Sequence, residues 1–143
     1  MRILGLDVGD RTIGVALSDP LGLTAQRLTL LTRKNESADT EAVAALAAKH
    51  AVGIVVVGLP LMMSGRSGTQ AAKTRAFAAA LNRKLGLPIE LVDERLTTVA
   101  GTRALLETNT SRRRRKEIID QVAAQLILQQ YLDRARPSTE PVA

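Results

Sequence analysis

The chain has 143 residues, of which 45% are hydrophobic and 24% charged, which is ordinary for a folded globular protein. It contains no cysteine, which excludes disulfide bonds and thiolate metal sites. No apolar run approaches the roughly 20 residues that a membrane-spanning helix needs. The first acid, Asp7, comes too early for a secretory signal. We therefore expect a cytoplasmic protein with a single domain over residues 1–134 and a flexible tail over residues 135–143.

Basic residues outnumber acidic ones, with 20 Lys and Arg against 14 Asp and Glu and a net charge of +6. Most of the basic residues are Arg, whose guanidinium can donate two parallel hydrogen bonds to a phosphate. This excess favours a nucleic acid as partner, and a merely basic surface is the alternative. With one Phe and one Tyr, base stacking cannot dominate recognition, so the backbone and shape should be recognised more than the sequence.

The first third of the chain predicts three strands and a helix. Apolar residues over 2–8 and 12–18 predict two strands, and the short connection between them predicts an antiparallel hairpin. A third short strand is expected over 26–31. Asn35 to Ser37 offers a helix cap, and the alanine-rich segment 41–50 favours a helix.

The rest of the chain alternates strands with helices. Gly53 to Gly58 is a continuous β-branched run, which is typical of a central strand buried on both faces. The elements expected after it are a loop over 59–68, a helix over 69–85, a short buried strand over 87–92, and helices over 97–107 and 116–134. Antiparallel strands followed by helical crossovers predict an α/β fold with a five-stranded mixed sheet and helices on both faces.

Acidic residues in three segments fall where the pattern otherwise predicts core. Asp7 lies between apolar residues of the first strand, and a buried carboxylate must be paired, hydrogen-bonded or bound to metal. Asp93 and Glu94 follow the last strand, at the sheet edge where ligands gather in open α/β folds. Asp120 has apolar residues at i+3, i+4 and i+7 on its helix, so it should face the sheet. Converging there, these acids would hold Mg²⁺ or Mn²⁺ for phosphodiester hydrolysis.

Each acid also has a purely structural explanation. Asp7 could cap the neighbouring turn. Asp93 or Glu94 could start the following helix or pair with Arg95. Asp120 could pair with a basic residue shortly before it. Taken together these explanations are weaker, because three acids on one buried side would repel one another without a cation.

Four stretches of the chain resemble the YqgF/RuvX family, in the same order along the sequence. They are Leu4-Gly5-Leu6-Asp7-Val8-Gly9 with Gly14-Val15-Ala16, then Val57-Gly58-Leu59-Pro60, then Asp93-Glu94-Arg95-Leu96-Thr97-Thr98, and finally Asp120 through Ala123-Ala124 to Ile127-Leu128. The resemblance spans residues 1 to about 134, and the Asp-Glu-Arg-Leu-Thr-Thr block is its most specific part. Members of that family are described as Holliday junction resolvases and as pre-16S rRNA nucleases.

The resemblance implies a ribonuclease H-like fold, similar to that of the RuvC resolvase, and a divalent-metal-dependent endonuclease. It implies catalytic and metal-binding roles for Asp7, Glu94 and Asp120, with Asp93 as a further candidate ligand. The implied substrates are the 5′ end of pre-16S rRNA, four-way DNA junctions, or both. Symmetric cutting of a junction favours a homodimer, whereas trimming rRNA needs one active site, so both monomer and homodimer stay open.

Basic residues expected to contact nucleic acid lie in the hairpin turn, in the loop over 59–68, beside Glu94 and in the segment 108–116. That segment is polar and then densely cationic, which predicts a mobile loop that becomes ordered against a phosphate backbone. A solvated linker without function is the alternative. The candidate nucleic-acid-binding residues are Arg11, Arg66, Arg95, Arg112, Arg113, Arg114, Arg115 and Lys116.

Two other functions stay open at the level of sequence. The pattern Gly5-x-Asp7-x-Gly9 followed by a hairpin also resembles the first phosphate motif of the actin, Hsp70 and sugar-kinase superfamily, which would make the chain an ATP-binding fragment. Those proteins close two related domains over ATP, and this chain provides one. The other alternative is a non-catalytic nucleic-acid-binding ribosome-assembly factor. The basic segment supports it, and the acids oppose it, because carboxylates repel phosphate unless a cation intervenes.

Overall fold

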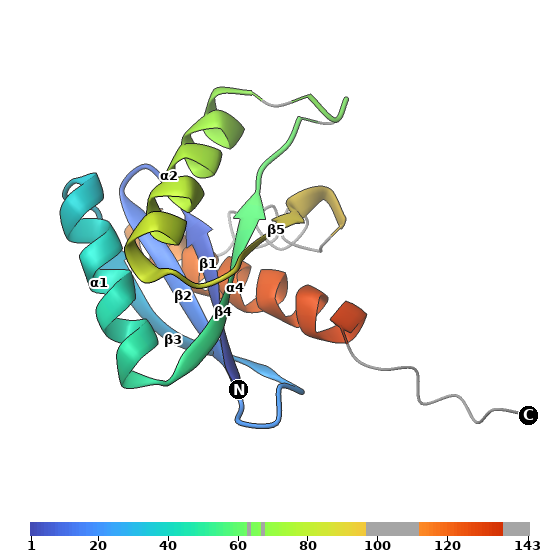
Figure 1. Ribbon diagram of the computed structural model, residues 1–143. Coiled ribbons are helices and arrows are strands. Elements are labelled where there is room, and N and C mark those ends of the chain that lie inside the picture. The colour runs from blue at the N-terminus through green and yellow to red at the C-terminus, as the bar shows by residue number, and fades with distance from the viewer. Residues whose placement is uncertain (63, 67, 97–111, 136–143) are drawn as a thin grey trace, which may run out of the picture.

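The computed structural model describes residues 1–62, 64–66, 68–96 and 112–135. These residues form a five-stranded sheet in the order β3-β2-β1-β4-β5, with helices against it (Figure 1). In chain order the elements are β1 (Arg2–Val8), β2 (Thr12–Ser18), β3 (Ala25–Thr32), α1 (Glu36–Lys49), β4 (Val52–Leu59), α2 (Thr69–Leu85), β5 (Ile89–Asp93), the 3₁₀ turn η1 (Glu94–Leu96) and α4 (Arg112–Ala135).

The pairing of the strands explains where a site can form. β2 pairs antiparallel with both β1 and β3, while β1 pairs parallel with β4 and β4 parallel with β5. A hydrogen bond of 2.9 Å from the Gly9 N–H to the Thr12 carbonyl closes the β1–β2 hairpin. Since β1, β4 and β5 run in the same direction, their carboxyl ends meet at one edge of the sheet.

Two hydrophobic cores hold the helices against opposite faces of the sheet. α1 and α2 pack on one face, where Leu81 lies in the same core as Val55. α4 crosses the other face, where Ile127 lies in the same core as Val56 (Figure 1). Val55 and Val56, which are consecutive on β4, therefore pack in the cores on opposite faces of the sheet. The mixed α/β sheet with helices on both faces is confirmed, and β4 is an interior strand covered on both faces, although the middle of the sheet is β1.

Most element bounds agree with the sequence predictions. β1, β2 and α2 have the predicted bounds, whereas α1 begins at Glu36, five residues before the predicted helix. The Asn35 side chain caps α1 by accepting a hydrogen bond of 2.8 Å from the Ala38 N–H, which leaves the first turn stable despite its polar residues. The helix predicted over 97–107 lies outside the described residues, and so does the tail predicted over 135–143 except for Ala135, which is the last residue of α4.

The start of α4 corrects one prediction. The sequence predicts a mobile basic loop up to Lys116, but the helix already begins at Arg112. Arg and Lys have high helix propensity, so the helix extends backwards through the basic run despite its charge.

Among the described residues, no helix is both long enough and apolar enough to cross a membrane.

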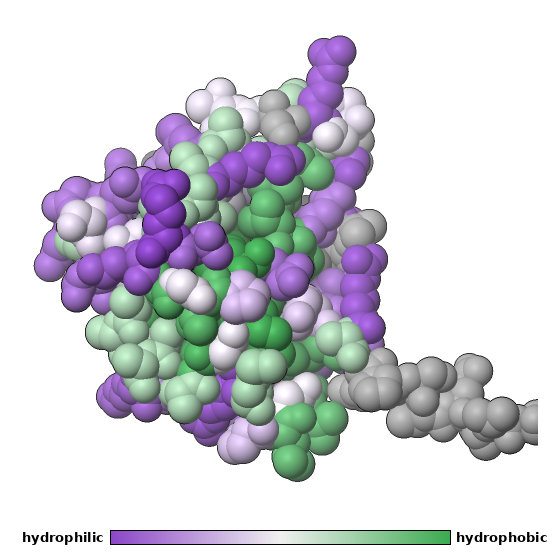
Figure 2. Space-filling view, in the orientation of Figure 1, coloured by the Kyte–Doolittle hydropathy of each residue, from purple (hydrophilic) through white to green (hydrophobic). Residues whose placement is uncertain are grey.

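β5 corrects another prediction. The sequence predicts a buried strand, but β5 is an edge strand, and Leu91 on it is 40% exposed. Val92 is buried because its side chain faces α4. Hydrophobic residues accordingly reach the surface near β4 and β5, in the middle of the face that Figure 2 shows.

Candidate active site

The alternation of side chains along the strands determines which face each acid joins. Ile3 of β1 and Val92 of β5 belong to the core beneath α4. Asp7 lies four residues after Ile3 on the same strand, so its side chain points to the α4 face. Glu94 follows the end of β5, and its Oε1 lies 3.0 Å from where a Cβ on Gly58 of β4 would stand. Because Gly58 has no side chain, the Glu94 carboxylate can lie close to β4 at this point.

Helix α4 brings the third acid to the same face. Asp120 is 8% exposed and Asp7 is 5% exposed. Gly14 of β2, which pairs with Asp7 across the hairpin, lies against the backbone of Asp120, where a Cβ would overlap the carbonyl oxygen. The Thr12 hydroxyl, also on β2, donates a hydrogen bond to the Asp120 carboxylate.

The three acids line one open cavity of about 200 Å³ at the carboxyl edge of the sheet. The other residues that line it come from the ends of β1 and β2, the turn between them, the loop after β4 and the first turn of α2. They are Val8, Gly9, Asp10, Arg11, Thr12, Pro60 and Gln70. The convergence of Asp7, Glu94 and Asp120 that the sequence predicts therefore agrees with the arrangement of the chain.

The donor set of this cavity suits a hard divalent cation. Carboxylate oxygens are the ligands that Mg²⁺ and Mn²⁺ prefer, and two of these carboxylates are almost fully buried. Within the described ranges, however, no three acidic or histidine side chains are already arranged as a metal site. The carboxylates share the walls of the cavity, and an ion would have to draw them closer together.

Asp93 lies differently from Glu94. It follows Val92 on β5, so its side chain points away from the α4 face, and it does not line the cavity. Its carboxylate forms an ion pair with Arg95 at 2.7 Å. Hydrogen bonds from the side chain and then the backbone of Arg95 lower the pKa of the Asp93 carboxyl below its ordinary value. This pairing is the structural role that the sequence left open for Asp93.

The candidate nucleic-acid-binding residues lie at different distances from the cavity. Arg11 lines it, and Arg66 is exposed in the loop after β4. Arg95 is held by Asp93 and lies beside that loop, since a Cβ on Gly65 would stand 3.4 Å from its Nη1. The side chains of Arg112, Arg113, Arg114, Arg115 and Lys116 lie outside the described part of the structure.

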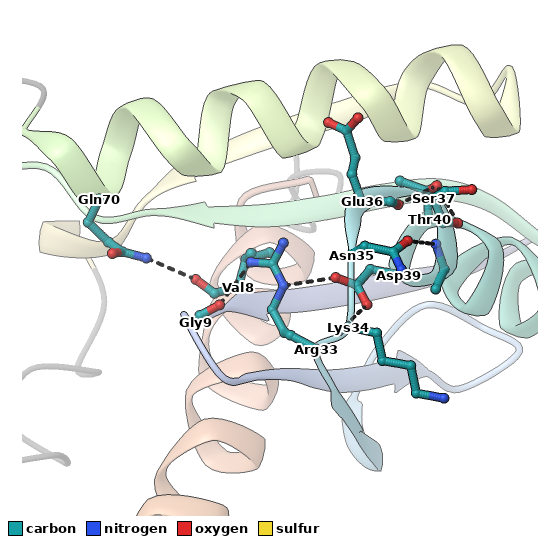
Figure 3. Close-up of polar contacts among 11 residues, drawn as sticks. Val8, Gly9, Arg33, Lys34, Asn35, Glu36, Ser37, Asp39, Thr40 and Gln70 are labelled. Atoms are coloured by element: carbon teal, nitrogen blue, oxygen red, sulfur yellow. Dashed lines mark hydrogen bonds and ion pairs between the residues drawn. The ribbon is translucent and has the colours of Figure 1, made fainter.

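Asp10, Thr12 and Gln70 are polar residues of the cavity that the sequence did not identify as site residues. Thr12 contacts Asp120 directly, and Gln70 donates a hydrogen bond of 3.5 Å to the Val8 carbonyl beside Asp7 (Figure 3). The sequence held a signal for Thr12, which shares a face of β2 with Gly14 because the two are two residues apart. Gln70 approaches β1 only through the tertiary fold, so no local pattern predicts it.

Comparison with known proteins identifies the family and similar relatives of this chain. The model of a family described as RuvX, Holliday junction resolvase, matches residues 1–134. A protein of Moorella thermoacetica named "Putative pre-16S rRNA nuclease" is 59% identical over 134 residues, which cover 94% of this chain and 96% of that protein. A protein of the same name from Myxococcus xanthus is 56% identical over 137 residues, which cover 96% of this chain and 91% of that protein.

Two solved structures with a similar fold are Holliday junction resolvases. RuvC of T. thermophilus in complex with a Holliday junction substrate matches with a TM-score of 0.59 at 14% identity, and the match covers 94% of each chain. The fowlpox virus Holliday junction resolvase matches with a TM-score of 0.54 at 12% identity, over 95% of this chain and all of that one. These likenesses confirm the ribonuclease H-like fold. Since the family model covers nearly the whole sequence, the chain belongs to the RuvX family.

Proposed function

We propose that this protein is a divalent-metal-dependent endonuclease that hydrolyses phosphodiester bonds of structured nucleic acid. The observation that carries the proposal is the position of Asp7, Glu94 and Asp120, which come from three distant segments and line one cavity. Membership of a family described as resolvases supports a nuclease over an ATP-binding fragment. The family also supports catalysis over a purely binding role.

Asp7, Glu94 and Asp120 would hold the ion, with Asp7 on a strand and Asp120 on a packed helix as the more rigid supports. A bound Mg²⁺ or Mn²⁺ would lower the pKa of an attacking water and stabilise the charge that develops on the phosphate. Thr12 would keep the Asp120 carboxylate oriented toward the cavity through its hydroxyl. The buried surroundings of both aspartates strengthen their attraction for a cation.

Basic residues around the cavity would bind the phosphate backbone of the substrate. Arg11 is the best placed of the candidates because it lines the cavity itself. Arg66 is exposed on the adjacent loop, and the run at the start of α4 adds a concentrated positive charge to the same helix as Asp120. Each phosphate contact would release counterions, so binding should weaken steeply with salt.

The favoured substrate is the 5′ end of pre-16S rRNA, with four-way DNA junctions as the second candidate. The relatives from Moorella thermoacetica and Myxococcus xanthus, both more than half identical to this chain, carry the name of the rRNA nuclease. The two resolvase structures compared above share only the fold with this chain, at 14% and 12% identity. Cleavage of an rRNA precursor also needs no second active site.

The test compares cleavage of an RNA spanning the 5′ end of pre-16S rRNA with that of a four-way DNA junction and a linear duplex. Each is measured with Mg²⁺, with Mn²⁺ and with chelator. Asp7→Asn, Glu94→Gln and Asp120→Asn should each lower the rate by at least about a hundredfold, as loss of an ion ligand does. Glu90→Gln on β5 and Asp133→Asn on α4 remove exposed acids from the same elements and should stay active. Equal rates in wild type and the three site variants would overturn the proposal.

A further inference from the structure

One wall of the cavity is the β1–β2 turn, which the hydrogen bond from the Gly9 N–H to the Thr12 carbonyl closes. The last paired residues of the β1–β2 hairpin are Val8 and Ile13, and beyond them the chain turns through Gly9, Asp10 and Arg11. All three turn residues line the cavity. Beyond that bond, the position of Arg11 depends on contacts from outside the hairpin.

Lys73 of α2 contributes an ion pair of 3.5 Å with Asp10 between two exposed side chains, and Arg33 makes two further contacts. Its backbone N–H donates a hydrogen bond of 2.8 Å to the Arg11 carbonyl, and its Nη1 donates one of 2.9 Å to the Gly9 carbonyl. The two bonds hold both ends of the turn from the side of β3 and α1. Figure 3 shows the Arg33 guanidinium between the Gly9 carbonyl and the Asp39 carboxylate.

The Arg33 side chain is itself held in place. Its Nε forms an ion pair of 3.1 Å with Asp39 of α1, which is 5% exposed and also accepts a hydrogen bond of 3.0 Å from the Lys34 N–H. The guanidinium lies over the ring of Phe77 of α2, 4.9 Å from its centroid, within cation–π range. With contacts from both helices, the guanidinium has little freedom to leave the turn.

We propose that Arg33 is a positioning residue for substrate binding, which fixes the cavity-lining turn and thereby the place of Arg11. This inference rests on the proposed function, because it assigns Arg11 a contact with nucleic acid. Asp7 and Thr12 are held by strand pairing with Gly14 and Thr32, so loss of Arg33 leaves these cavity residues in place. The effect should therefore appear in substrate affinity and not in the metal dependence of cleavage.

The variant is Arg33→Met, which keeps the aliphatic length and removes the charge and the side-chain donors, while the backbone hydrogen bond from residue 33 to the Arg11 carbonyl remains. Arg83→Met is the matched control. Arg83 is exposed in the last turn of α2, whereas α2 lines the cavity through Gln70 in its first turn. Arg33→Lys serves as the second variant, since it keeps the charge but cannot bond Gly9 and Asp39 with the same fork. Thermal unfolding verifies that each variant is folded.

The first readout needs no substrate. Amide hydrogen exchange of Gly9, whose N–H bonds the Thr12 carbonyl, should become about fivefold faster in Arg33→Met, and less so in Arg33→Lys. Arg83→Met should exchange at the wild-type rate. Unchanged exchange of Gly9 in both Arg33 variants would overturn the proposal whether or not the protein is a nuclease.

The second readout is the affinity for the RNA spanning the 5′ end of pre-16S rRNA. It is measured in an Asp7→Asn background so that the RNA is not cleaved. Arg33→Met and Arg11→Met should each raise Kd by about three- to tenfold and reduce the salt slope by about one. The double variant should be no worse than Arg11→Met alone. Additive losses, or a loss equal to that of Arg83→Met, would overturn the link between Arg33 and Arg11.

Cleavage kinetics separate this role from general damage. Arg33→Met should raise KM about three- to tenfold with kcat and the Mn²⁺ dependence close to wild type. A variant whose only defect is a smaller folded fraction would lower the apparent kcat at unchanged KM, and that result would contradict the proposal. A wild-type protein that neither binds nor cleaves RNA or junction DNA would overturn the proposed function and the role of Arg11 alike, while the exchange of Gly9 still tests Arg33.

Discussion

Gly14 of β2 lies directly against the backbone carbonyl of Asp120 of α4, at a distance that leaves no room for a Cβ atom. The same glycine pairs with Asp7 across the hairpin. The two buried aspartates of the cavity are thus placed relative to each other through one residue that has no side chain. The close approach of helix and strand there determines how near the two carboxylates can come.

Gly14→Ala should displace the start of the buried part of α4 and reduce cleavage more than stability. Overpacking of a tight contact costs about 1–3 kcal/mol. A shift of about 1 Å in a catalytic group can cost about a hundredfold in rate. Urea unfolding and cleavage of the preferred substrate measure the two effects on the same preparation.

Gly53→Ala is the control for that substitution. A Cβ on Gly53 would meet the side chain of Met1, which is 76% exposed and free to move away. This variant should retain wild-type activity and nearly wild-type stability. If Gly14→Ala behaved in the same way, the close approach of α4 to β2 would have no functional importance.

The hydroxyl of Thr12 should matter more than its methyl group. Thr12→Val removes the hydrogen bond to Asp120 with little change of shape, whereas Thr12→Ser retains it. Loss of such a bond to a metal ligand typically costs about 10- to 100-fold in metal affinity or activity. We expect Thr12→Val to shift the Mn²⁺ dependence of cleavage to higher concentration by about tenfold. Thr12→Ser should stay within about twofold of wild type, and equal metal dependence in both variants would contradict the orienting role.

The sequence predicts the fold well where local signals are strong. The short turn between β1 and β2, and the glycines on either side of α2, delimit their elements, so these bounds are confirmed. The exposed edge position of β5 could not be predicted, because an apolar run does not tell whether a further strand lies beside it. The backward extension of α4 to Arg112 depends on helix propagation from a packed segment, which outweighs charge repulsion.

The candidate site also contains residues that the sequence predicts and residues that only the tertiary structure reveals. Asp7, Glu94 and Asp120 each contradict an apolar pattern in their own segment, and this made them recognisable before the fold was known. Arg33 and Gln70 belong to segments with no unusual pattern. They contact the cavity turn and the Val8 carbonyl through packing of β3 and α2 against the hairpin, which only the tertiary structure provides.

The Asp19 carboxylate should make stability depend on pH below the neutral range. Hydrogen bonds from the N–H groups of Thr24, Leu23 and Leu21 lower the pKa of Asp19, with that of Thr24 the largest cause. A lowered pKa in the folded state contributes stability above the unfolded value of about 3.9, and this contribution is lost as pH falls through the folded value. Asp19→Asn should therefore lower the urea midpoint at neutral pH, and its difference from wild type should shrink below about pH 4. Glu90→Gln, which replaces an exposed acid on β5, is the control, and a difference for Asp19→Asn that stays constant from neutral to acidic pH would refute the assignment.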